Sequence, residues 1–172
     1  MESSSPEVAW SGKHFQVLRT PVRYPDGSLR THEQVQAPDV VRVYGVADGC
    51  VLLTNEYRAD VGRRVIRVPA GRIESGETPE AAAAREFQEE AGYTAGKLEL
   101  LRTTTPVLKF RHQAWHYLAT DISRTGQDLG FGEDIEVVAT PLDEIEELVF
   151  GEAVPEDSIA LTLLMIARRL RR

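Results

Sequence analysis

The stretch GRIESGETPEAAAAREFQEEAGY, residues 71–93, contains six glutamates and two arginines in 23 positions. It begins as a loop and continues as a helix, because Thr78 can cap the first turn with its side chain and Gly92 is placed to end the last one. On such a helix Glu86 and Glu90 lie one turn apart on the same face, where like charges repel each other. Helix stability alone therefore does not account for these acids.

The composition is that of an ordinary globular chain. Its 172 residues can bury a sizeable core, and 42% of them are hydrophobic. The net charge of -7 disfavours a protein that coats nucleic acid or an anionic membrane, so we expect neither as a partner. Cys50 is the single cysteine, and no secretory signal or long apolar run is present, which favours the cytoplasm.

Strand patterns surround the acidic stretch. Alternating and β-branched runs predict a hairpin over 15–35 with a turn at 25–28 and a second hairpin over 40–57 with a turn at 47–49. Further strands are predicted at 65–68, 98–105, 115–120 and 135–139. Helices are expected at 79–91, from 140 to 150, and from 155 onward, while residues 1–6 are expected to be a loose polar end. The order of elements predicts a mixed α/β domain.

A divalent cation would convert the repulsion between the acids into attraction. Mg²⁺ prefers oxygen ligands and takes one or two carboxylates together with phosphate oxygens and water. Glu86, Glu89 and Glu90 supply carboxylates, the turn before the helix could add the carbonyl of Ala70, and Arg85 is spaced to orient Glu89. The alternative is a solvated acidic helix face, which leaves the Pro-Ala-Gly turn and the arginine without an explanation.

The spacing of the fixed residues resembles a known motif. Gly71, five residues, Glu77, seven residues and then REFQEEAGY from position 85 resemble the Nudix box, GX5EX7REUXEEXGU, in which U is a bulky apolar residue. Every fixed position is filled, although Tyr93 stands where an aliphatic residue is more usual. The resemblance implies the Nudix α/β/α sandwich, with a mixed sheet between helices, the box as loop–helix–loop, and additional antiparallel strands at the N-terminus.

The same resemblance implies an activity and a domain plan. Nudix hydrolases cleave a nucleoside diphosphate linked to another group, by attack of water with the help of a divalent metal. For this chain that implies Mg²⁺, or alternatively Mn²⁺. One domain is expected over 1–172, in which about 1–38 form strands that pair two copies into a homodimer and 71–93 form the box.

Residue roles follow from the match to the box. Glu86 and Glu90 are the expected principal metal ligands, and Glu89 is a third ligand or a helper for the attacking water. The implied catalytic set is Arg85, Glu86, Glu89, Glu90 and Glu133; the metal set is Ala70, Glu86, Glu89, Glu90 and Glu133; the loop-fixing set is Gly71, Glu77 and Gly92. Glu133 is included because the base in this family is often a glutamate outside the box; it could also be a further metal ligand or an ordinary loop carboxylate.

The flanking segments resemble the ADP-ribose and nucleoside-diphosphate-sugar pyrophosphatases within the superfamily. NEYR at 55–58 is similar to their QYR-type segment, and VPAG at 68–71 is similar to their PAG turn. Arg58 would then contact a phosphate or the terminal ribose, or else be a surface arginine. The implied reaction cleaves a sugar nucleotide such as ADP-ribose to a nucleoside monophosphate and a sugar phosphate.

Two departures from that branch leave the substrate open. Arg67 stands where members often carry glutamate, and residues 104–112 lack the usual glycine and acid. Arg67, Lys109 and Arg111 could bind a phosphate or be rim residues. For His112 and His116, expected on one strand, a structural or ligand-stacking role is favoured over metal binding.

Other functions compete with this one. The alternatives are a non-catalytic sensor of nucleotide sugars and a Nudix hydrolase of NADH, dinucleoside polyphosphates or nucleoside triphosphates. The complete set of box acids and the absence of a basic patch disfavour a DNA-linked sensor. The N-terminal strands disfavour a triphosphate hydrolase, whose members are usually shorter there.

Overall fold

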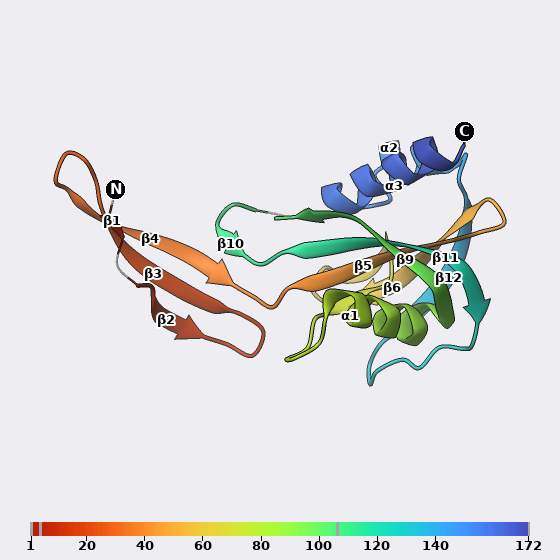
Figure 1. Cartoon of the computed structure of the whole chain (residues 1–172), viewed down its shortest axis with the longest axis horizontal. Helices are drawn as coiled ribbons and strands as arrows, with labels where there is room; N and C mark the ends of the chain where they lie inside the picture. Colours follow the sequence, from red (N-terminus) through yellow and green to blue (C-terminus); the bar gives the residue numbers. More distant parts are fainter. Residues whose placement is uncertain (1, 4, 106, 172) are drawn as a thin grey trace. The chain divides into compact units, whose positions relative to one another are not determined.

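The computed structural model describes residues 2–3, 5–105 and 107–171, which fall into two compact units (Figure 1). The N-terminal unit takes its residues from 1–39 and 105–114, and the second unit from 40–104 and 115–172. Within the described residues, no helix has both the length and the apolar character needed to cross a membrane.

The N-terminal unit is a sheet built on the predicted hairpin. Its order is β1-β3-β4-β10, with β2 also paired to β3. The turn between β3 and β4 forms as predicted, because Gly27 adopts a φ of 81° and Asp26 accepts a hydrogen bond from the Ser28 amide at 2.9 Å. The strands are β1 (Glu2–Ser3), β2 (Glu7–Ser11), β3 (Gln16–Arg23), β4 (Leu29–Gln36) and β10 (Phe110–Arg111).

Two features of this unit differ from the prediction. The loose end expected over 1–6 is wrong for Glu2–Ser3, which pair with β3; positions 1 and 4 lie outside the described residues. Strand β2 was not predicted, because its five residues, EVAWS, are too few for a strand pattern to be clear, and all of them are exposed in the structure.

The second unit contains a larger sheet, in the order β12-β6-β5-β11-β9, with β7 paired to β6 and β8 to β5. The predicted hairpin of β5 and β6 forms through Asp48 and Gly49, which both have positive φ as a two-residue turn requires. The strands are β5 (Val40–Ala47), β6 (Cys50–Arg58), β7 (Arg63–Arg67), β8 (Ala70–Arg72), β9 (Tyr93–Thr104), β11 (Ala114–Arg124) and β12 (Ile135–Pro141).

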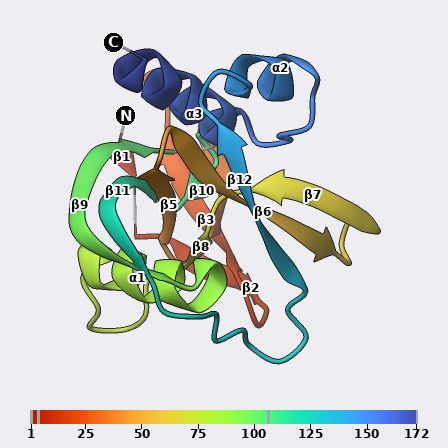
Figure 2. The same ribbon diagram turned by 90° about the vertical axis from the view of Figure 1, so that its right-hand side faces the viewer.

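Helices cover both faces of this sheet (Figure 2). On one face α1 (Pro79–Glu86) and the π-helix η1 (Phe87–Ala91) pack on side chains that include Val41, Val43 and Leu52. On the other face α2 (Ile145–Phe150) and α3 (Asp157–Leu170) pack on side chains that include Tyr44, Val51 and Leu53. Successive residues of a strand point to opposite faces, so β5 and β6 supply both cores. The predicted α/β/α sandwich is confirmed.

The helix of the acidic stretch begins as predicted. Thr78 caps it by accepting a hydrogen bond from the Ala81 amide at 3.2 Å, and Gly92 ends it with a φ of 75°. Its second half differs from the predicted α-helix, because Phe87–Ala91 form a π-helix, a rare conformation that is frequent at functional sites. The next helix also differs: β12 continues to Pro141, so α2 begins only at Ile145.

Candidate functional site

Arg85 gathers three of the predicted carboxylates around one guanidinium group. Its Nε and Nη2 donate to the two carboxylate oxygens of Glu77, at 2.9 and 3.0 Å. Its Nη1 donates to Glu86 at 2.7 Å and to Glu89 at 3.1 Å. Arg85 thereby links the loop before α1 to residues 86–90 at the end of the helix, which we call the acidic turn.

Gly71 makes room for the Glu86 carboxylate. A Cβ atom at position 71 would lie only 1.9 Å from Oε1 of Glu86, so the carboxylate packs directly against the Gly71 backbone. Glu86 is 9% exposed in this position. A glycine is required here for close approach rather than for an unusual backbone angle.

Glu90 lies on the other side of the same turn. Its Oε2 accepts a hydrogen bond from the Ala70 amide at 2.7 Å. Burial raises the pKa of Glu90 to about 8, and the negative charges of Glu86, Glu56 and Glu133 contribute in the same direction. Burial also raises the pKa of Glu86, against the lowering effect of Arg85.

This donor set fits a hard divalent cation. Among the described residues no three His, Cys, Asp or Glu side chains converge in a ready-made cation site, because Arg85 and the Ala70 amide bind carboxylate oxygens of the acidic turn. Burial is the main cause that raises the pKa of Glu90 and Glu86, and the negative charges of neighbouring acids add to it; a cation would relieve the repulsion between those charges. All their donor atoms are oxygens, as Mg²⁺ and Mn²⁺ prefer.

Glu133 belongs to the same neighbourhood. It lies in the loop between β11 and β12, and its carboxylate accepts a hydrogen bond from the Gly130 amide at 2.7 Å. Its charge raises the pKa of both Glu86 and Glu90. The structure thus brings this residue, 43 positions after Glu90 in the chain, to the acids of the box.

The predicted substrate-binding residues are divided between the two units, and the two in the second unit, Arg58 and Arg67, line one pocket. The side chain of Arg58 is 43% exposed and binds Asp60 through Nε at 3.1 Å and Nη2 at 3.0 Å. Arg67 is bound by two carboxylates, through Nη1 to Glu56 at 2.8 Å and through Nε to Glu156 at 2.6 Å. Lys109 and Arg111 belong to the N-terminal unit, at β10, and not to the unit that carries the box.

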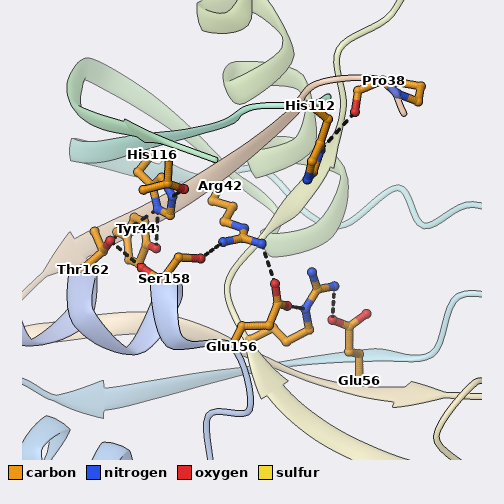
Figure 3. A network of polar contacts seen from close by, with 11 residues as sticks. Pro38, Arg42, Tyr44, Glu56, His112, His116, Glu156, Ser158 and Thr162 are labelled. Carbon is orange, nitrogen blue, oxygen red and sulfur yellow. Dashed lines mark hydrogen bonds and ion pairs between the residues drawn. The ribbon is translucent and has the colours of Figure 1, made fainter. Parts of the chain in front are cut away.

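Sequence reasoning missed a polar network around Glu156, which is labelled in Figure 3 and accepts a hydrogen bond from Arg67. Glu156, just before α3, also accepts a hydrogen bond from Arg42 of β5, and Arg42 donates in turn to Ser158. These partners are 114 and 116 positions apart, so no local pattern relates them. A possible signal was the charged residue at 42, because it interrupts the apolar strand 40–47.

The two histidines do not share a strand. His112 follows β10 in the N-terminal unit and approaches the carbonyl oxygen of Pro38 at 3.3 Å. His116 is buried in β11, within hydrogen-bond distance of the Tyr44 hydroxyl, at 2.8 Å, and of the Thr104 hydroxyl, at 2.9 Å (Figure 3).

A comparison with protein-family models decides the family. The NUDIX domain model matches residues 34–161, which is most of the chain and includes the whole acidic stretch. The chain belongs to the NUDIX domain family. The membership predicted from the box is therefore confirmed.

Individual relatives agree with this assignment. An ADP-ribose pyrophosphatase of Bacillus subtilis (strain 168) is 31% identical over 161 residues, covering 91% of this chain and 87% of the relative. An ADP-ribose pyrophosphatase of Mycobacterium tuberculosis is 31% identical over 172 residues, covering 96% and 83%. A solved structure described as an ADP compounds hydrolase superposes with a TM-score of 0.87 at 21% identity, over 99% of this chain and 94% of that one. The superposition confirms the Nudix fold.

Proposed function

We propose that this Nudix protein is a Mg²⁺-dependent pyrophosphohydrolase that cleaves the diphosphate of a sugar nucleotide such as ADP-ribose. The products are a nucleoside monophosphate and a sugar phosphate. The observation that carries the proposal is the cluster of acids at the end of α1, with buried Glu86 against Gly71 and half-buried Glu90 against Ala70. The similarity to ADP-ribose pyrophosphatases over nearly the whole chain supports this substrate class.

The acidic turn would hold the metal. Glu86, Glu89 and Glu90 would supply carboxylate oxygens and Ala70 its carbonyl oxygen. When bound, the metal would neutralise the diphosphate and help to activate a water molecule. Arg85 keeps Glu86 and Glu89 oriented through its hydrogen bonds, and Glu77 keeps Arg85 in place.

Glu133 is the proposed base. Its carboxylate is placed near the acids of the box, and a base in that position can accept a proton from the attacking water. The hydrogen bond from the Gly130 amide orients it. Of the four predicted substrate-binding residues, Arg58 remains the best candidate for a phosphate or ribose contact, because it is exposed and its partner Asp60 is exposed as well.

The N-terminal unit is proposed to pair two copies of the chain. Its strands expose large apolar side chains, among them Val8 at 56%, Trp10 at 52% and Leu29 at 63%. Such side chains in an antiparallel sheet suit an interface between copies. Light scattering after size-exclusion chromatography should give a dimer, and Trp10→Ser should shift it toward the monomer. A cytoplasmic location stays a prediction from the single Cys50.

A hydrolysis screen tests the function. Purified protein with Mg²⁺ or Mn²⁺ is given ADP-ribose, other ADP- and GDP-sugars, NADH, dinucleoside polyphosphates and nucleoside triphosphates, and the products are separated by chromatography. AMP and ribose 5-phosphate from ADP-ribose are the expected result. Glu86→Gln should keep the fold and lower the metal-dependent turnover by orders of magnitude. Normal turnover in that variant would contradict the assignment, and no turnover of any substrate with metal bound would favour a sensor.

A further inference from the structure

The loop after β11 closes the end of the acidic turn. The amides of Thr125 and Gly126 both donate to the carbonyl oxygen of Gly92, at 2.8 and 3.0 Å, and the amide of Asp128 donates to the carbonyl oxygen of Glu89 at 2.9 Å. A Cβ atom at position 92 would lie 2.8 Å from the backbone nitrogen of Gln127. The two backbones are therefore in direct contact.

Gln127 adds a side-chain contact at the centre of this junction. Its Nε2 donates to the carbonyl oxygen of Glu90 at 2.6 Å and approaches that of Ile135 at 3.3 Å. Glu90 ends the acidic turn and Ile135 begins β12, two positions after Glu133. One amide group thus connects the π-helix to the strand that follows the loop of the proposed base.

The last carbonyl groups of a helix lack donors within the helix and need partners from elsewhere. Here the residues at that end are Glu89 and Glu90, whose side chains form the proposed metal site. The backbone carbonyl oxygen of Glu89 accepts from the Asp128 amide, and that of Glu90 accepts from the Gln127 side chain. Both donors come from the loop after β11. Without the Gln127 side chain, the backbone carbonyl of Glu90 loses its donor, and the π-helix can change its conformation.

We infer that Gln127 is a positioning residue for the acidic turn, which it holds in the π-helical form that directs Glu89 toward Arg85 and Glu90 toward Ala70. The expected effect on catalysis rests on the proposed function, whereas the effect on the conformation of the turn does not. Gln127 touches neither the diphosphate nor the metal in this account. It acts through the backbone of Glu90.

Two variants of similar size test the role. Gln127→Glu replaces the donor by a carboxylate that faces the Glu90 carbonyl, and Gln127→Met removes hydrogen bonding while keeping the length of the side chain. Gln36→Glu is the matched control, because it makes the same charge change on exposed β4 in the N-terminal unit. The readouts are hydrogen exchange of a peptide covering 87–93, Mn²⁺ affinity by calorimetry, kcat and KM for ADP-ribose, and Tm.

Both Gln127 variants should exchange hydrogen in 87–93 about tenfold faster than the wild type and bind Mn²⁺ about 10- to 100-fold more weakly, as for other residues that orient metal ligands. Their kcat should fall while KM stays within about twofold, because the contact is to the acids and not to the substrate. Gln36→Glu should match the wild type in every readout.

Unchanged exchange and Mn²⁺ affinity in both variants would overturn the inference. So would a large fall in Tm with faster exchange throughout the second unit, which would mark Gln127 as a general structural residue. Failure of the proposed function is a separate result: the wild type would then hydrolyse none of the substrates. In that case the exchange of 87–93 still decides whether Gln127 holds the turn.

Discussion

Arg85 binds both carboxylate oxygens of Glu77, through Nε at 2.9 Å and Nη2 at 3.0 Å, across eight positions of the chain. The same guanidinium binds Glu86 and Glu89. Glu77 thus acts on two proposed metal ligands through the guanidinium of Arg85. This arrangement explains in physical terms why an isolated acid stands in the loop before α1.

Replacing Glu77 should therefore affect metal binding. Glu77→Gln retains one acceptor oxygen but places an NH₂ group against the guanidinium, so Arg85 loses its fixed orientation. We expect Mn²⁺ affinity and kcat/KM to fall about 10- to 100-fold. Calorimetry and steady-state kinetics measure both. Glu74→Gln is the control, since the exposed side chain of Glu74 takes no part in these bonds; an equal loss in both variants would contradict the specific role of Glu77.

Gly71→Ala should displace the Glu86 carboxylate. The added Cβ would lie 1.9 Å from its Oε1 atom, a distance that real contacts do not reach, so the carboxylate must move. We expect a loss of metal-dependent turnover of about 100-fold or more, since small misplacements of reacting groups have effects of this order. Circular dichroism should show an intact fold. Full activity in Gly71→Ala would mean that Glu86 acts from another position.

The beginning of the box could be predicted because its signals are local. Thr78 caps α1 through a residue three positions away, and the spacing of Gly71, Glu77 and Arg85 was enough to indicate the family. The sandwich was implied by the resemblance to the Nudix family, whereas the apolar runs of β5 and β6 predicted only strands; in the fold their side chains point to opposite faces of the sheet.

The remaining features depend on residues far apart in the chain. The π-helix is completed by donors from 125–128, and no pattern within 87–91 indicates them. Likewise the side chain of Arg67 is directed by Glu56 and Glu156, which are 11 and 89 positions away. Sequence reasoning could name Arg67 as a cation near the site, but could not determine which anion it binds.

Arg67 is expected to act mainly on stability. Its removal leaves the carboxylates of Glu56 and Glu156, 12% and 32% exposed, without their shared guanidinium. We expect Arg67→Gln to lower the free energy of unfolding by about 2 kcal/mol, less than for a fully buried pair because water still reaches these groups. Urea denaturation measures this free energy of unfolding. Arg63→Gln, at an exposed position of the same strand, should change it by less than about 0.5 kcal/mol.

The kinetics of the same variant separate two roles. A residue that binds a phosphate of the substrate should raise KM strongly when it is removed, whereas a stabilising residue should leave KM of the folded enzyme nearly unchanged. We expect Arg67→Gln to change KM for ADP-ribose by less than about threefold. A much larger increase, with normal stability, would restore the substrate-binding role predicted from the sequence.

His116 should make the stability of the protein depend on pH. Its side chain is fully buried, with Nδ1 near the hydroxyl of Tyr44 and Nε2 near that of Thr104. Burial, and next the positive charges of Arg42 and Arg102, lower the pKa of His116 from 6.5 to about 4. The imidazole is therefore neutral in the folded protein at pH 5, where it carries a proton in the unfolded chain.

Because the unfolded chain takes up this proton first, the contribution of His116 to stability is complete above pH 6.5 and declines as the pH falls toward 4. The expected decline is about 3 kcal/mol over that interval. His116→Gln keeps polar atoms in the cavity but has no such proton, so the stability difference between wild type and variant should shrink from pH 7 to pH 4.5. Urea denaturation at both pH values measures this difference, and a difference that is independent of pH would show that His116 has the same pKa in the folded and unfolded states.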